Sequence, residues 1–188
     1  MPADKPRHLQ GSRDMVLSMA PLVLLILLVA GAARACSFSP GGPSTAPPPT
    51  IDAQAAFAND ASNVSYPIRA PKLPDGWVAN SANTVAIGST SSSRVGFITT
   101  GDRYLRLAQS SAAVAALLPA EVDGLSTTDS TGTKEVGGTS WTIYVRQGGE
   151  PAWVADLGPV RLLITGSGTP TDFNTLARAV LAVEPLTS

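Results

Sequence analysis

One apolar stretch dominates the pattern of hydrophobic and polar positions along the chain. Residues 15–33 contain no charged side chain and consist mainly of Leu, Val, Ala and Met. A helical run of this length can cross the hydrocarbon core of a bilayer, which is about 30 Å thick. The pattern therefore predicts a transmembrane helix over residues 15–34, following a tail of residues 1–14, with the lipid bilayer as the partner of this segment.

The charges on either side of this stretch predict its orientation. Lys5, Arg7 and Arg13 precede it, whereas Arg34 is the only basic residue between it and Arg69. Basic residues beside a membrane span are found mainly on the cytoplasmic side. We therefore expect a single-pass plasma-membrane protein with a cytoplasmic N-terminus and an extracytoplasmic C-terminal domain.

Three interpretations of this stretch remain open. It is an uncleaved signal anchor, a signal peptide cleaved after Ala35, or a lipoprotein signal acylated on Cys36. The length favours the anchor, because a cleavable signal has an apolar run of about 7–15 residues. Arg34 argues against the lipoprotein signal, and all three interpretations export the rest of the chain.

The pattern changes after residue 34. Residues 35–56 are rich in Pro, Ser and Gly and predict a linker that leads into a short helix, and residues 57–188 predict one extracytoplasmic domain. Alternation of apolar and polar residues predicts strands over 77–87, 93–99, 103–108, 139–146, 152–157 and 160–165. Helices are predicted over 51–62, 111–118 and 171–183, the second ending before a proline and the third capped near Thr171.

These elements predict an α+β fold. After the transmembrane helix, we expect a meander-like antiparallel sheet of about six strands, with the helices, including the C-terminal one, packed on one face. Residues 118–138 are rich in Ser, Thr, Asp and Gly, and we expect them to form a long loop.

Composition excludes several classes of function. From residue 37 onward the chain has nine basic and twelve acidic residues and no basic patch, which argues against binding nucleic acid. The only histidine is His8 and the only cysteine is Cys36. We therefore expect no histidine- or cysteine-dependent catalysis, no metal site and no cofactor, and hence no enzyme; only carboxylate chemistry remains open.

The same alternation places candidate binding residues. Tyr104, Arg106, Tyr144 and Arg146 lie out of phase with the apolar positions of their strands, so they are candidates for a ligand or partner surface. Trp141 is in phase with the apolar positions and is predicted to belong to the core.

A glycine-rich segment precedes the last helix. Residues 166–168 (Gly-Ser-Gly) are typical either of a phosphate-binding loop or of a simple turn between a strand and a helix. Asp172 favours the turn, because its negative charge opposes an anion at the start of that helix.

Five short motifs carry a resemblance to a known family. They are residues 13–19, 74–77 (Pro-Asp-Gly-Trp), 104–109, 137–144 and 164–168, in this order. Together they resemble an actinobacterial membrane family catalogued as domain of unknown function 4245. The resemblance implies a single-pass envelope protein and brings no activity with it.

The expected function follows from these observations. We expect a non-catalytic extracytoplasmic module that binds an envelope component or a membrane-protein partner. One alternative is a periplasmic carrier or sensor of an apolar ligand held in a cavity between the sheet and its helices. A second is an envelope hydrolase that uses carboxylates.

Overall fold

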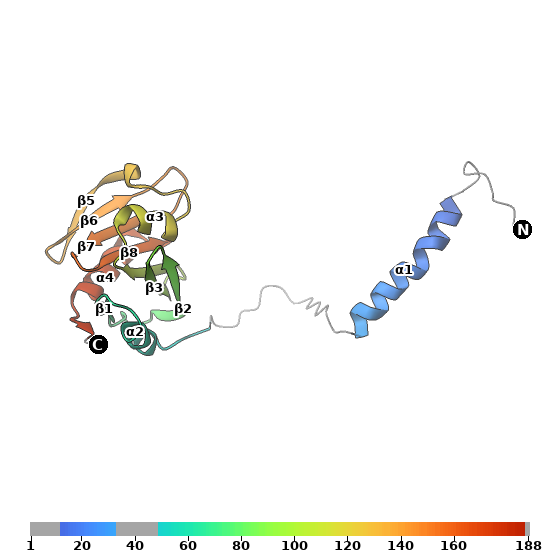
Figure 1. Ribbon diagram of the computed structural model, residues 1–188, viewed down its shortest axis with the longest axis horizontal. Helices are drawn as coiled ribbons and strands as arrows, with labels where there is room; N and C mark the ends of the chain where they lie inside the picture. Colours follow the sequence, from blue (N-terminus) through green and yellow to red (C-terminus); the bar gives the residue numbers. More distant parts are fainter. Residues whose placement is uncertain (1–11, 33–48, 187–188) are drawn as a thin grey trace, which may run out of the picture. The chain divides into compact units, whose positions relative to one another are not determined.

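The computed structural model describes residues 12–32 and 49–186 and divides the chain into two compact units, Met1–Ala46 and Pro47–Ser188 (Figure 1). In the first unit, α1 (Ser12–Ala32) is a helix whose side chains from Val16 to Val29 are all exposed. Within the described ranges, no helix combines the length and the apolar character needed to cross a membrane. The helix predicted to span the bilayer over residues 15–34 is therefore not supported, while most of the tail, most of the linker and Cys36 lie outside the described residues.

The second unit has the predicted α+β class. Its main sheet has seven antiparallel strands in the order β2-β3-β4-β8-β7-β6-β5. The strands are β2 (Val78–Ile87), β3 (Thr90–Ile98), β4 (Tyr104–Ser110), β5 (Ser130–Val136), β6 (Thr139–Tyr144), β7 (Ala152–Asp156) and β8 (Arg161–Gly166). All six predicted strands are present, and the seventh, β5, lies within the segment expected to be a loop.

The sheet consists of two meanders rather than one. β2, β3 and β4 form the first, β5 to β8 form the second, and the two join where β4 pairs with β8, as at Leu107 opposite Ile164. The connection from β4 crosses to the far edge of the sheet before β5 begins. Short loops predicted the neighbours within each meander correctly. The loop lengths did not predict that the longer connection from β4 leads to the far edge of the sheet.

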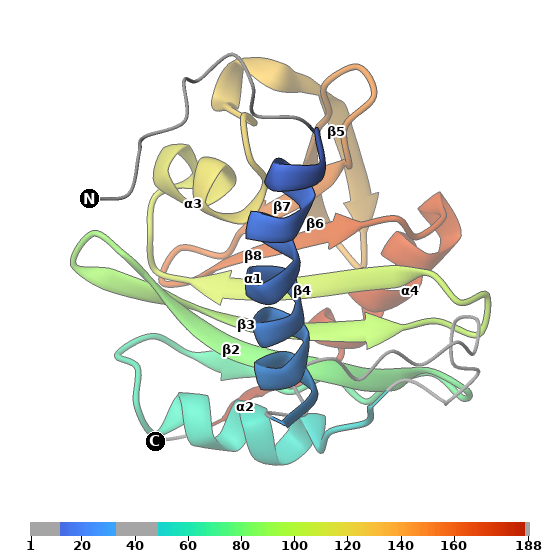
Figure 2. The same cartoon turned by 90° about the vertical axis from the view of Figure 1, so that its right-hand side faces the viewer.

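One face of the sheet carries the larger core. It is covered by α2 (Ala53–Ala61) and α4 (Pro170–Leu181), and α4 lies partly behind β4 in Figure 2. Phe57 of α2 and Phe173 of α4 are almost fully buried, as is Trp141 of β6. The prediction that Trp141 belongs to the core is confirmed. These packed side chains form the core between the sheet and the two helices.

A third helix covers the other face, contrary to the expectation that the helices share one face. α3 (Val114–Glu121) packs Leu117 and Leu118 against Val154 and Leu163. A single-turn helix, η2 (Thr127–Asp129), follows it. Because β4 alternates its side chains between both faces, the chain leaving it can cover either one, and here it covers the face opposite α4.

A buried glutamine holds the short strand β1 (Ile68–Arg69), which pairs with β9 (Pro185–Leu186). Gln109 Oε1 accepts a hydrogen bond from the Arg69 backbone N–H at 2.9 Å, and Gln109 Nε2 donates to the Arg69 carbonyl oxygen at 2.7 Å. The side-chain amide thus satisfies the backbone N–H and carbonyl groups of Arg69, as the backbone of a neighbouring strand would, and it fixes β1 beside the sheet.

Candidate functional site

An open groove lies between the sheet and the N-terminal end of α4. We call it the α4 groove; its volume is about 350 Å³ and its lining residues are Lys134, Ile143, Pro151, Trp153, Gly168, Pro170 and Phe173. The lining is mainly apolar, and one ammonium group is present. Small-molecule sites in proteins have this composition, and their volumes begin near about 300 Å³.

Strand register places the sheet side of the groove. Ile143 of β6 is opposite Trp153 of β7, and Lys134 of edge strand β5 is opposite Trp141. Paired residues of antiparallel strands point to the same face, so Lys134, Ile143 and Trp153 all face α4.

The start of α4 supplies the opposite wall. Thr169 caps the helix: its Oγ1 accepts from the Asp172 N–H at 3.2 Å and donates to Asp172 Oδ2 at 2.7 Å. The Thr169 N–H also donates to Asp172 Oδ2, at 2.8 Å. This reciprocal capping box fixes the first turn of the helix, and with it Pro170 and Phe173.

Two aromatic rings and one cation define the geometry of the groove. The ring centroids of Trp153 and Phe173 are 5.3 Å apart, with their planes tilted by 39°. The Lys134 Nζ lies 5.1 Å from the centroid of the Trp153 ring, within the range of a cation–π interaction. Such a site can bind the apolar part of a ligand and place one positive charge beside it.

The glycines beside the groove have a packing role. A Cβ on Gly166 would lie 2.3 Å from the Tyr104 carbonyl oxygen, and one on Gly168 would lie 2.8 Å from Leu105 Cδ2. The Ser167 N–H donates to the Tyr104 carbonyl oxygen at 2.9 Å. Residues 166–168 thus pack closely against β4, and this contact accounts for both glycines without a bound phosphate.

Two further pockets lie elsewhere in the second unit. One, of about 480 Å³, is lined by Ile51, Asp52, Ala53, Gln54, Lys72, Leu73 and Ala79. The other, of about 250 Å³, is mostly polar and is lined by Asn63, Val64, Ser65, Tyr66, Ser89, Thr90 and Ser91. We favour the α4 groove over the larger pocket because its walls come from paired strands and a capped helix and include two aromatic rings.

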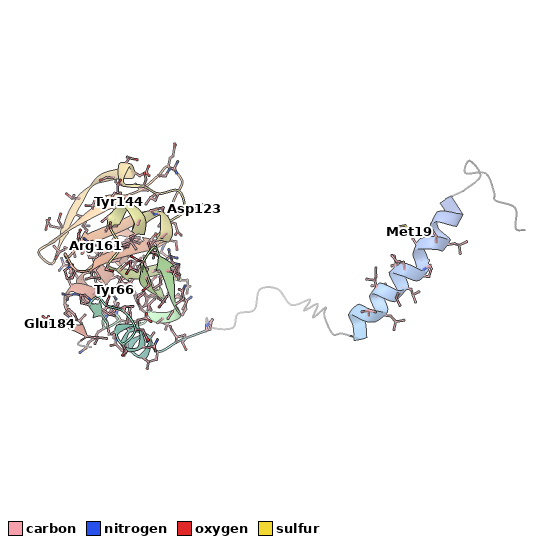
Figure 3. All side chains as sticks on the ribbon, in the orientation of Figure 1. Met19, Tyr66, Asp123, Tyr144, Arg161 and Glu184 are labelled. Atoms are coloured by element: carbon pink, nitrogen blue, oxygen red, sulfur yellow. The ribbon has the colours of Figure 1, made fainter. Side chains whose placement is uncertain are left out.

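The residues predicted to form a binding surface lie on the other face of the sheet or beyond it. Tyr104, Arg106 and Tyr144 share the face that α3 covers. Tyr144, labelled in Figure 3, is only 8% exposed and packs in the smaller core. The Tyr104 ring lies over Gly96, where an added Cβ would be 2.6 Å from the tyrosine hydroxyl. Their role in binding remains a prediction.

Arg106 belongs to a charged cluster that sequence reasoning missed. Glu121, at the end of α3, has a fully buried side chain whose Oε1 accepts from Ser92 Oγ at 2.6 Å and from Arg94 Nε at 2.9 Å. Arg106 Nε lies 3.3 Å from Glu121 Oε2, and its Nη2 donates to the Glu121 carbonyl oxygen. Arg94 also donates to the carbonyl oxygen of Ala120. These contacts hold α3 against the sheet. Arg94 and Arg106 therefore have a structural role.

Arg146 is separate from the other three candidates. It is exposed, lies 3.9 Å from Asp129 Oδ1 and donates to the Gly124 carbonyl oxygen. Hydrogen bonds from the backbone and the side chain of Ser126 lower the pKa of Asp129, and Arg146 lowers it further. Arg146 therefore braces the segment between α3 and β5.

Comparison with known proteins adds a family. The model of a family described as "Protein of unknown function (DUF4245)" matches residues 7–180. Searches of curated proteins and of solved structures gave no match.

Proposed function

We propose that this chain, which belongs to the DUF4245 family, is a non-catalytic binding protein that takes an apolar ligand in the α4 groove. Its N-terminal helix would hold it at the plasma membrane, with the second unit on the extracytoplasmic side. The ligand would be a component of the cell envelope, either free or as part of a membrane-protein partner.

The observation that carries this proposal is the composition of the groove. Trp153 and Phe173 line the groove with only small exposed fractions, 5% and 1%, and the partly exposed Ile143 and Pro151 add aliphatic surface. Burial of apolar surface contributes about 25 cal/mol for each Å² removed from water. An apolar ligand in this groove would gain from that burial.

The chemistry of the second unit supports a non-catalytic role. Residues 49–186 contain no histidine and no cysteine, and no described group of three or more His, Cys, Asp or Glu residues could hold a metal ion. Several carboxylates make structural contacts, and three of them, Glu121, Asp129 and Asp172, pair with arginines or cap helices. None of the three lines the groove.

The sequence of the first unit supports the membrane location. Residues 15–33 are uncharged, and the large apolar side chains of α1 from Val16 to Val29 are more than half exposed. A helix that is apolar on every side is stable where an apolar environment surrounds it. A bilayer supplies such an environment, and the basic residues of the tail favour the orientation proposed.

One experiment tests both parts. Membranes of the cells that make the protein are washed with alkaline carbonate, and the full chain is extracted and examined by native mass spectrometry. We expect the chain to stay in the washed membranes and to carry a stoichiometric small-molecule adduct. The adduct should be lost in Ile143→Phe, which narrows the groove.

The control is Thr142→Phe, which adds a ring to the same strand on the opposite face of the sheet. This variant should keep the adduct. Release of the chain by carbonate would contradict the membrane location. A wild-type chain without an adduct, or one that Ile143→Phe leaves unchanged, would contradict binding in the α4 groove.

A further inference from the structure

We infer that the α4 groove selects small ligands that carry one acidic group, and that Lys134 recognises this group. The inference rests on the proposed function, since it names the class of ligand that the same groove binds. The ligand is a small monocarboxylic acid with a short apolar body.

The first step of the argument is the position of Lys134. Its backbone is fixed in β5 by the pairing with Trp141, and its ammonium group lies over the Trp153 ring at the wall of the groove. The side chain is partly buried. The cation–π contact orients the ammonium group and leaves its charge in place, because an aromatic ring carries no net charge.

The second step is that Lys134 has no acidic partner in the part of the chain that the structure describes. The four ion pairs of residues 49–186 are all made by arginines: Arg94, Arg106, Arg146 and Arg161. Glu135, the next residue, points to the opposite face of β5, as its pairing with Ser140 requires. The groove thus presents a positive charge without a counter-charge.

Asp172, in the first turn of α4, is already engaged. The Asp172 carboxylate accepts hydrogen bonds from the backbone and the hydroxyl group of Thr169. Its negative charge at the start of α4 also disfavours an anion at the helix terminus. A ligand acid is therefore expected beside Lys134 and away from the end of the helix.

The size and lining of the groove limit the rest of the ligand. A volume of about 350 Å³ is near the lower end of small-molecule sites. Aromatic and proline side chains favour a short, flat or branched apolar body. An acid paired with Lys134 beside this apolar surface is less screened than in open water, so charge contributes to selection.

The test compares two probes of nearly the same size and shape, the charged 3-phenylpropionate and its neutral amide 3-phenylpropanamide. The full chain is labelled with 5-fluorotryptophan, placed in nanodiscs of zwitterionic lipid, and titrated by ¹⁹F NMR. The sequence has three tryptophans, and Trp153→Phe assigns the resonance at the groove. Trp77 and Trp141 serve as internal controls because both are buried outside the groove lining.

We expect both probes to shift the Trp153 resonance, with the acid binding about fivefold more tightly than the amide. Lys134→Met, which keeps the length and removes the charge, should abolish this preference, and Lys134→Arg should retain it. Lys72→Met removes another lysine, one that lines a different pocket, and should change nothing. For the two Lys134 variants, an unchanged Trp77 resonance shows that the protein is folded, because Trp141 is the cross-strand neighbour of Lys134. For Lys72→Met, an unchanged Trp141 resonance serves the same purpose.

Equal binding of acid and amide, or a preference that survives in Lys134→Met, would overturn the inference and leave the proposed apolar binding intact. Failure of both probes to shift the Trp153 resonance would count against the inference and the proposed function together.

Discussion

At the scale of the residue, Glu121 shows how one buried carboxylate joins two layers of the protein. Ser92 and Arg94 on β3 and Arg106 on β4 all approach it, while the residue itself ends α3. A buried charge is tolerated when it is paired and hydrogen-bonded, and its removal leaves the partners without compensation. Glu121 therefore determines how firmly α3 is held.

Replacing Glu121 by Gln should lower the free energy of unfolding by about 2–3 kcal/mol, measured by urea denaturation. The amide keeps the size of the side chain but leaves two guanidinium groups without a counter-charge. Both arginines are partly exposed, so water can solvate them in the variant, and this limits the loss of stability. Asp123→Asn, an exposed change nearby, should stay within about 0.5 kcal/mol; an equally small effect of Glu121→Gln would show that the cluster adds no stability.

Tyr66 should make stability depend on pH in the alkaline range. Its side chain is buried, and burial raises its pKa above the ordinary value, although the hydrogen bond with the Ser91 hydroxyl group acts in the opposite sense. The folded protein then holds this proton more tightly than the unfolded chain does. The free energy of unfolding should therefore fall as pH rises above about 10, the ordinary tyrosine pKa.

The measurement is urea denaturation between about pH 8 and pH 11 for the wild type and Tyr66→Phe. At the lower pH, the variant should be less stable by about 1 kcal/mol, because it lacks the hydrogen bond to the Ser91 carbonyl oxygen. This difference should shrink as pH rises. Two parallel curves would contradict the shifted pKa.

At the scale of the element, the last helix begins where its capping chemistry is complete. The sequence places a threonine cap near Thr171, but the structure begins α4 at Pro170 with Thr169 as the cap. A proline is favoured in the first helical position because it lacks the N–H that would be unpaired there. The reciprocal bonds between Thr169 and Asp172 then decide between the two candidate threonines.

Replacing Thr169 by Ala should therefore cost about 1 kcal/mol of stability, the usual effect of removing a helix cap. Thr171→Ala, two residues on and exposed, should change stability by less than about 0.5 kcal/mol. Thermal or urea unfolding of both variants provides the comparison. Equal effects of the two changes would show that the capping box does not stabilise α4.

Two elements depart from the sequence pattern for identifiable reasons. α3 continues through Pro119 because Glu121 and the arginine bonds to the carbonyl oxygens of Ala120 and Glu121 hold its last turn. Edge strand β5 exposes most of its side chains, and only Val136 is fully buried. The alternation of apolar and polar residues that predicts a strand is therefore absent over β5, and its Ser, Thr and Gly residues suggested a loop instead.

At the scale of the whole molecule, the local pattern predicted the fold class, most strands and the neighbours within each meander, but it could not predict that β4 pairs with β8. The alternation put Tyr104, Arg106, Tyr144 and Arg146 out of phase with the apolar positions, and the first three share one face of the sheet. It could not show that α3 would cover that face. The α4 groove joins Lys134, Trp153 and Phe173 from three distant parts of the chain, so it exists only once strand register and helix position are known.

The strand order also determines when the sheet can be completed as the chain emerges from N- to C-terminus. β4 and β8 are neighbours at the centre of the sheet, yet β5, β6 and β7 lie between them in the sequence. The inner edge of β4 therefore stays without its partner until residues 161–166 have appeared, after every other strand of the main sheet. Until then, the unpaired backbone groups at this edge of β4 can pair with a strand of another chain, so a newly made chain is exposed to aggregation at this stage.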